Sequence, residues 1–211
     1  MEKKEKKEDK RNGNGIFFEA ASYFLLAVIV LLSLATYDRN RAFENDLTLW
    51  EDAASKGGGK WRPHNNFGLA LERAGQLDMA IEEYGEALRL EYGSIEPRVN
   101  RGRAYAMKGR LNDAVMDLKM VLFFAPGQVE AHNNLGNVYA MLGRADDAIT
   151  EYREAVKLRP GLLSARFNLA MLYMKKGMKE EAIGELETVL RLNPGDGEAR
   201  RLLDELRAVR P

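Results

Sequence analysis

The sequence contains no cysteine and only two histidines, His64 and His132. The absence of cysteine excludes disulfide bonds, thiolate metal ligands and cysteine nucleophiles. A metal site needs several converging ligands, so we expect the two histidines to pack or to lie on a helix surface. Lysine and arginine together number 32, as do aspartate and glutamate. This balance gives no reason to expect a nucleic-acid partner.

Recognisable catalytic motifs are also missing. The sequence has no Ser/His/Asp arrangement, no metal-ligand spacing and no glycine-rich nucleotide loop. Residues 57–60 read Gly-Gly-Gly-Lys, but the phosphate-loop spacing G-x-x-x-x-G-K-[ST] is absent and Trp61 follows the lysine. We interpret 57–60 as a linker. We expect no enzyme activity, no catalytic residues, no bound metal and no cofactor.

What the chain does contain is an internal repeat with a period of 34 residues. Small residues recur at this interval at three positions of each unit, and such periodicity indicates a repeat architecture. The units are 61–94, 95–128, 129–162 and 163–196. The recurring residues are Gly68, Gly102, Gly136 and Ala170; Gly75, Gly109, Gly143 and Gly177; and Ala80, Ala114, Ala148 and Ala182.

Each unit is predicted to form two amphipathic helices that bury an apolar face by stacking on their neighbours. The first helix ends near the Gly75 series, where glycine adopts a left-handed conformation without steric cost. Acceptor or acidic residues then begin the second helix. The small residues allow close approach of the two helices. The residues expected to begin the second helices are Asp78, Asn112, Asp146 and Glu180.

The pattern L-G-x-x-Y…A-x-x-x-[YL]…P resembles the tetratricopeptide repeat. The third unit carries it most fully, and the resemblance covers about 61–196. It implies an all-α, right-handed α-solenoid of four helix pairs. The pattern in the third unit is formed by Leu135, Gly136, Tyr139, Ala148, Tyr152, Ala155 and Pro160; departures from the family are His64, Arg98, His132 and Arg166 in place of an aromatic residue, Arg101 in place of leucine, and Tyr92 in place of proline.

Helical segments are expected at both ends of the repeats. Residues 38–56 predict a half-repeat that caps the N-terminal end, because Trp50 and Ala53 occupy the places of Tyr84 and Ala87 one period later. Residues 38–60 thus comprise this cap and the glycine-rich linker. Residues 197–211 predict a capping helix with one apolar stripe and a charged back, as the end of a solenoid requires. With both ends capped, we expect the chain to be complete.

The N-terminal region predicts a membrane anchor. Residues 1–15 are charged and expected to be disordered. Residues 16–37 are apolar apart from Glu19 and would span about 33 Å as a helix, enough for a bilayer. A cleaved signal peptide is the alternative. Its apolar region would be about 7–15 residues long and end in a small-x-small site. Here the run ends in Thr36-Tyr37-Asp38-Arg39, so we favour an uncleaved signal-anchor.

The basic residues around this segment predict its orientation. Six lysines and arginines precede it, whereas Arg39 and Arg41 follow it. The positive-inside rule then places the N-terminus in the cytoplasm. The repeats are expected on the periplasmic or extracytoplasmic side of the inner (plasma) membrane.

Four asparagines recur at one position of the first helices: Asn66, Asn100, Asn134 and Asn168. The family resemblance implies that these helices line a concave groove. Amides donate and accept, so they match the backbone of an extended peptide, and the superhelical repeats of O-linked N-acetylglucosamine transferases are similar in this respect. The alternative is that each asparagine only bonds the neighbouring repeat.

The same resemblance places further residues on or beside the groove. Methionines there adapt to varied ligands, and the basic residues would attract acidic groups or a terminal carboxylate. The positions of the carboxylate-clamp lysine in chaperone-binding members hold Asn65, Val99, Asn133 and Phe167, so we do not expect that specificity. The further groove residues are Asn65, Leu69, Arg73, Arg103, Met107, Asn133, Asn137, Met141, Phe167, Met171, Met174 and Lys175.

Together these features favour a membrane-anchored scaffold that binds protein or peptide partners and serves the assembly of envelope complexes. The alternative is an accessory or regulatory subunit of a membrane glycosyltransferase or polysaccharide-export system. Phe123 stands where the other units have Arg89, Lys157 and Arg191. It is either a contact for a partner or second copy, or an exposed aromatic without a role.

Overall fold

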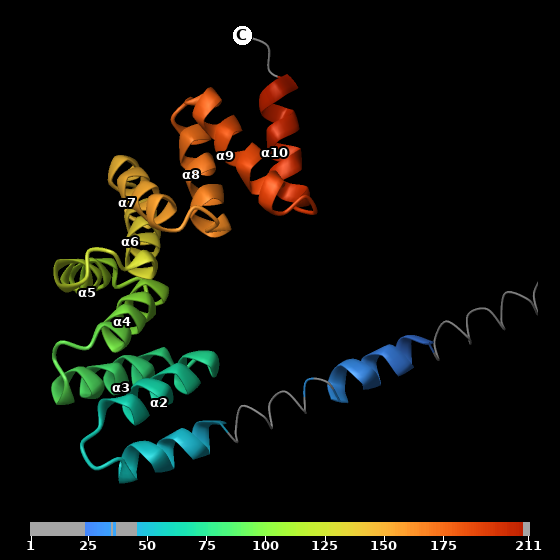
Figure 1. Ribbon diagram of the computed structural model, residues 1–211. Helices are drawn as coiled ribbons and strands as arrows, with labels where there is room; N and C mark the ends of the chain where they lie inside the picture. The colour runs from blue at the N-terminus through green and yellow to red at the C-terminus, as the bar shows by residue number, and fades with distance from the viewer. Residues whose placement is uncertain (1–23, 35, 37–45, 209–211) are drawn as a thin grey trace, which may run out of the picture. The chain divides into compact units, whose positions relative to one another are not determined.

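The computed structural model describes residues 24–34, 36 and 46–208, which fall into two units, Met1–Leu49 and Trp50–Pro211. The described part of the second unit is helical throughout, without strands, and forms paired helices followed by a single one (Figure 1). The all-α solenoid prediction is confirmed. The helices are α2 (Trp61–Arg73), α3 (Leu77–Leu90), α4 (Ile95–Met107), α5 (Leu111–Phe124), α6 (Val129–Met141), α7 (Ala145–Leu158), α8 (Leu163–Lys175), α9 (Lys179–Leu192) and α10 (Gly197–Ala208).

The period of the sequence is also the period of the backbone. The first helices of the four pairs begin at Trp61, Ile95, Val129 and Leu163, the first residues of the four units. The glycine after each first helix has a positive φ, 77° at Gly75 and 73° at Gly143. A side chain in this conformation would be strained, and glycine therefore ends these helices as predicted.

The small residues of the first helices allow the second helices to approach closely. A Cβ atom at Gly136 would lie 2.7 Å from the Tyr152 ring, and one at Gly102 would lie 2.9 Å from Leu118 Cγ. Both distances are shorter than van der Waals contact. In the first three pairs the two helices thus pack at this spacing because glycine is present.

The starts of the second helices differ from the sequence prediction. The N-cap positions hold residues such as Arg110 and Arg144, and no side chain caps α3, α5, α7 or α9. The acidic residues lie inside the first turn instead, where the positive end of the helix dipole favours them. There Asp147 accepts a hydrogen bond of 2.7 Å from Arg144 Nε.

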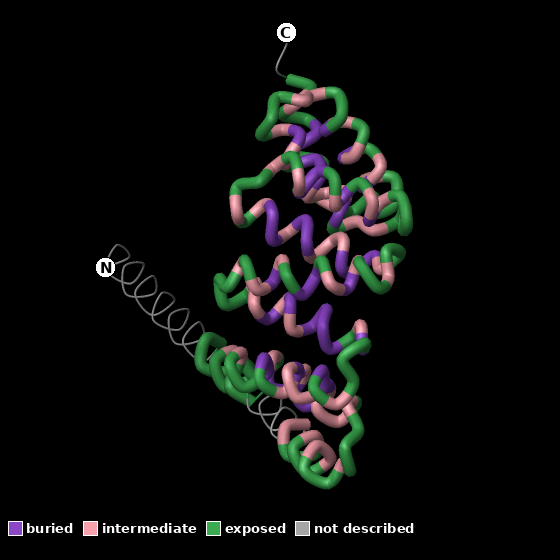
Figure 2. The backbone as a smooth tube through the Cα atoms, turned by 90° about the vertical axis from the view of Figure 1, so that its left-hand side faces the viewer, coloured by how far each residue is buried: buried purple, intermediate pink, exposed green. Residues whose placement is uncertain are grey.

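The first helices form the inner row of the solenoid. Helix α4 contacts both α2 and α6 as well as the second helices on either side of it. Buried residues run through the middle of the stack, between exposed outer turns (Figure 2). A continuous apolar core joins Val99 and Leu118 of the second repeat to Leu135 and Tyr152 of the third. Stacking therefore buries the apolar face that each pair would expose alone.

The departures from the family pattern have a structural role. His64, Arg98, His132 and Arg166 each pair with an acidic residue of the following second helix. In the third repeat, His132 Nδ1 lies 2.7 Å from Glu151 Oε2. In the second, Asp117 is buried and also binds Arg101 through contacts of 2.7 and 2.8 Å. A polar side-chain contact thus links the two helices where an aromatic residue is usual.

The two ends of the repeats are helical. Residues 46–56 form a helix in which Trp50 and Ala53 are half-buried. At the other end, α10 buries Ala199, Leu202 and Leu203 in a cluster with α9. Residues 209–211 lie outside the described residues.

The first unit contains helical residues 24–34 and 36. Most of their large apolar side chains are exposed, and the Ser33 and Thr36 hydroxyls donate to the carbonyls of Ile29 and Leu32. Among the described residues, no helix is both long enough and apolar enough to cross a membrane. The predicted span 16–37 is only partly covered, because 16–23, 35 and 37 lie outside the described residues, as does the tail 1–15.

Candidate binding pocket

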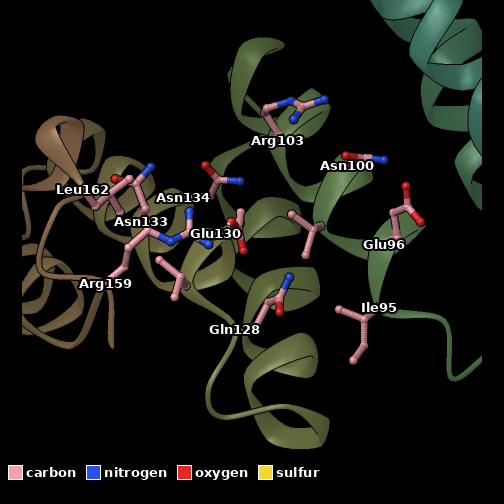
Figure 3. Close-up of a pocket in the computed structure, with 12 residues that line it drawn as sticks. Ile95, Glu96, Asn100, Arg103, Gln128, Glu130, Asn133, Asn134, Arg159 and Leu162 are labelled. Carbon is pink, nitrogen blue, oxygen red and sulfur yellow. Dashed lines mark hydrogen bonds and ion pairs between the residues drawn. The ribbon is translucent and has the colours of Figure 1, made fainter. Parts of the chain in front are cut away.

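A pocket of about 500 Å³ opens on the inner row between α4 and α6, in the second and third repeats. Residues of α4 form one wall and residues of α6 the other, and the turn between α7 and α8 closes one end (Figure 3). The lining residues are Ile95, Glu96, Val99, Asn100, Arg103, Gln128, Val129, Glu130, Asn133, Asn134, Arg159 and Leu162.

Apolar and amide groups share this lining. Ile95, Val99, Val129 and Leu162 provide the apolar surface. Gln128, Asn100, Asn133 and Asn134 provide the amides. Such a mixture of apolar surface and a few polar groups is typical of binding sites.

Three of the four recurring asparagines form hydrogen bonds within the protein. Asn100 Nδ2 donates to Asn65 Oδ1 at 2.9 Å, and Asn65 Nδ2 in turn lies 3.4 Å from Asn66 Oδ1. Asn168 Nδ2 donates to Asn137 Oδ1 at 3.0 Å. For Asn100 and Asn168, bonding to the preceding repeat is therefore what the structure shows.

Asn134 is the exception. It forms no hydrogen bond with any side chain in the described part of the chain. The equivalents of Asn65 and Asn137 in the preceding repeat are Val99 and Arg103. Val99 has no polar side-chain atom, and Arg103 is directed at Glu72, with contacts of 2.9 and 3.0 Å. The pocket lies at this junction, where the asparagine has no neighbour to bond.

Asn133 adds a second unsatisfied amide. Its Oδ1 atom is buried and receives no hydrogen bond from the described residues. Buried polar atoms in proteins are almost always hydrogen-bonded, and this atom, which solvent does not reach, is an exception. Asn133 and Asn134 are adjacent on α6 and both line the pocket (Figure 3).

The two arginines of the pocket are already paired. Arg103 binds Glu72, which also accepts a hydrogen bond of 3.0 Å from Tyr84 Oη. Burial, reinforced by the negative charge of Glu72, raises the pKa of Tyr84 well above its usual value. Arg159 Nη2 lies 2.8 Å from Glu130 Oε1. Arg103 therefore links the first two repeats, and the prediction that it attracts an acidic ligand gains no support from its position.

Comparisons with known proteins decide the family. Two family models, both described as tetratricopeptide repeat, match residues 65–128 and 139–206. The chain is a tetratricopeptide repeat protein. A comparison with curated proteins gave no match.

Solved tetratricopeptide repeat structures share this fold. The crystal structure of MamA is 22% identical over 74% of this chain and 92% of that chain, with a TM-score of 0.66. TTC0263 of Thermus thermophilus is 23% identical over 84% and 96%, with a TM-score of 0.64. YrrB, described as a TPR protein with an unusual peptide-binding site, is 23% identical over 75% and 82%, with a TM-score of 0.63. At such identities the likeness shows the fold alone.

The remaining residues predicted for the groove of the tetratricopeptide repeats lie outside the pocket. Of the predicted residues, it brings together only Asn100, Arg103, Asn133 and Asn134. Phe167 and Met174 pack against the apolar core. The others are distributed along the inner helices and are exposed or half-buried, apart from the buried Asn65: Asn65, Asn66, Leu69, Asn137, Asn168, Arg73, Met107, Met141, Met171 and Lys175.

Sequence reasoning missed the residues at the start of the first helices and in the turn before α8. These include Glu96, Gln128, Glu130 and Arg159. A signal was available, because aligning the units places Ala125 where the third unit has Arg159. Phe123 is 78% exposed and packs edge-on against Phe124 at a centroid distance of 5.2 Å. It lies on α5, away from the pocket.

Proposed function

We propose that this protein is a membrane-anchored scaffold that binds extended peptide segments of protein partners on the inner face of its tetratricopeptide repeats. The observation that carries the proposal is the pocket between α4 and α6, in which Asn134 lies beside apolar surface and forms no hydrogen bond with a side chain of the described residues. The peptide-binding site described for YrrB supports the same function by likeness of fold.

The chemistry of the pocket suits an extended chain. Each peptide unit of such a chain presents one N–H donor and one C=O acceptor. The Asn134 side chain can satisfy both. The apolar residues of the pocket contact a side chain of the bound segment. Because backbone groups are recognised, partners can differ in sequence.

The anchor and the location are parts of the same proposal. The apolar run 16–37 inserts in the inner membrane with the N-terminus in the cytoplasm, and the repeats lie on the other side. The exposed apolar side chains of helical residues 24–34 support this. The anchor raises the local concentration of the pocket for envelope complexes under assembly. The protein acts by binding and has no catalytic step of its own.

Photo-crosslinking tests the binding site. A photoreactive residue is placed at Asn134 in one variant of the full chain and at Asn112, an exposed residue at the start of α5, in another. We expect the photoreactive residue at position 134 to crosslink partners in cells that the one at position 112 does not. An excess of wild-type protein should compete for these partners better than an excess of the Asn134→Ala protein. The same partners at both positions, or none at Asn134, would contradict the proposal.

Reporter fusions at the C-terminus test the topology. We expect activity from a reporter that works only outside the cytoplasm. Activity of a reporter that works only in the cytoplasm would refute the proposed orientation and leave the pocket proposal to the crosslinking result.

A further inference from the structure

Two equivalent glutamates of the pocket have different surroundings. Glu96 and Glu130 occupy the same position in the first turns of α4 and α6. Glu130 is neutralised by Arg159 at 2.8 Å. The residue that corresponds to Arg159 for Glu96 is Ala125, which carries no charge. Among the described residues, Glu96 forms no ion pair, and its one hydrogen-bond contact is the Asn65 amide at 3.4 Å.

The charge of the pocket is consequently negative. Arg103 is neutralised by Glu72 and Arg159 by Glu130, which leaves the Glu96 carboxylate without a counter-charge. Glu96 and Asn100 lie at the α4 side of the pocket, across from Asn133 and Asn134 (Figure 3). An exposed carboxylate without a counter-charge favours a ligand with a cationic donor group.

The apolar surface beside Glu96 completes the pattern. Ile95 and Val99 come from the same helix, and Val129 belongs to the α6 side of the lining. Lysine and arginine side chains commonly lay an alkyl stem on apolar surface and place the charged head at a polar edge. The pocket offers both parts in this order.

We propose that the pocket receives a lysine or arginine side chain of the bound peptide, with its alkyl stem on Ile95, Val99 and Val129 and its cationic head at Glu96. This inference rests on the proposed peptide-binding function and names the chemistry of the partner. The sequence favours acidic ligands on the inner face, whereas this inference favours basic ones. The reason is that both arginines of the pocket already form ion pairs within the protein.

Selection from a peptide library tests the inference. The probe is a phage-displayed library of random heptapeptides, selected on the purified full chain. We expect lysine and arginine to be enriched over glutamate at one position of the selected peptides. Glu96→Gln should reduce this enrichment about threefold to fivefold, the factor expected for an ion pair with an exposed carboxylate. Raising the salt concentration should reduce it as well.

Two further variants sharpen the test. Ala125→Arg places a cation where the third repeat has Arg159, and it should pair with Glu96 and abolish the basic preference. Glu82→Gln changes an exposed glutamate of α3 outside the pocket, so it should leave the preference unchanged.

The outcomes separate the two proposals. Peptides whose binding is lost in Asn134→Ala support peptide binding in the pocket. If those peptides show no preference for lysine or arginine, the basic-residue inference is overturned. It is also overturned if Glu96→Gln leaves such a preference intact. If the wild type selects no peptides, or if the wild type and Asn134→Ala select the same peptides, the peptide-binding function is overturned. The basic-residue inference then falls with it.

Discussion

The junction between the second and third repeats differs from the junctions on either side of it. Asn100 bonds Asn65 across the first junction and Asn168 bonds Asn137 across the third. Ion pairs join the same repeats, between Lys108 and Asp78 and between Lys176 and Asp146. At the middle junction Leu142 and Asn112 replace the Lys–Asp pair, and Asn134 forms no side-chain hydrogen bond with the described residues. The pocket lies at this junction.

The apolar packing does not follow this difference. Val99, Val121, Ala131 and Leu135 belong to one core that continues through the middle junction. At the middle and third junctions the stacking of the repeats is therefore set by apolar burial. The polar groups on the inner face differ between the junctions, and the pocket lies at the junction where Asn134 is not bonded to the preceding repeat.

The largest effect is expected within the second repeat, which borders the open junction. Asp117 is 1% exposed and binds Arg101 and Arg98. Asp117→Ala leaves two arginines beside the core without a counter-charge and should cost about 3–5 kcal/mol of unfolding free energy. Urea unfolding of the full chain, followed by circular dichroism, measures this. Glu151→Ala, at the equivalent and more exposed position of the third repeat, is the control. An equal or larger loss for Glu151→Ala would contradict the prediction.

The third repeat should show a loss of stability at high pH. Burial raises the pKa of Tyr152 to about 12, whereas an unfolded tyrosine titrates near 10. Below pH 10 Tyr152 is protonated in both the folded and the unfolded chain, so its titration does not lower the unfolding free energy. As the pH rises from about 10 to about 12, only the unfolded chain ionises, and about 2–3 kcal/mol is lost.

Tyr152→Phe isolates this contribution. The difference in unfolding free energy between this variant and the wild type cancels the titration of the other residues. The pH-dependent part of the loss should be smaller in Tyr152→Phe by the amount given above. The second repeat has Leu118 at this position and supplies no such titration. Parallel stability curves for the two proteins between pH 9 and 12 would exclude a buried, neutral Tyr152.

The recurring asparagines allow a direct comparison of two junctions. Asn100→Ala removes a bond to Asn65, which is 1% exposed, and should cost about 1–3 kcal/mol because a buried amide is left unsatisfied. Asn134→Ala at the open junction should leave the unfolding free energy unchanged. Denaturant midpoints of the two variants decide this. Similar losses would mean that Asn134 is bonded in solution and that the middle junction is closed.

The smallest effect concerns the third junction at neutral pH. Tyr152 Oη donates to Asn137 Oδ1 at 2.6 Å, and the same oxygen accepts from Asn168. Tyr152→Phe removes one donor while Asn168 remains, so the expected loss is about 0.5–1.5 kcal/mol. A thermal unfolding curve at pH 7 checks it. A loss beyond this range would indicate that the tyrosine hydroxyl also holds the asparagine bond in place.

The fold was more predictable than the site, and particular residues show why. Gly102, Gly136 and Gly143 mark close contacts and helix ends that depend only on local geometry, which is repeated in each unit. The role of Asn134 was not predictable in this way. Its sequence position is the same as that of Asn100, and it differs only because Val99 and Arg103 are its neighbours in space. The sequence predicts that Arg103 is available for a ligand, whereas in the structure it is bonded to Glu72.

The sequence by itself determined the period, the paired helices, the left-handed glycines and the tetratricopeptide repeat family, because these follow from local sterics and apolar periodicity. Only the tertiary structure decided which polar side chains are consumed by internal bonds. That outcome depends on distances between residues about one repeat apart, such as Arg159 to Glu130 and Asn100 to Asn65. The Glu96 carboxylate and the Asn134 amide are the polar groups of the pocket that remain available after those bonds are formed.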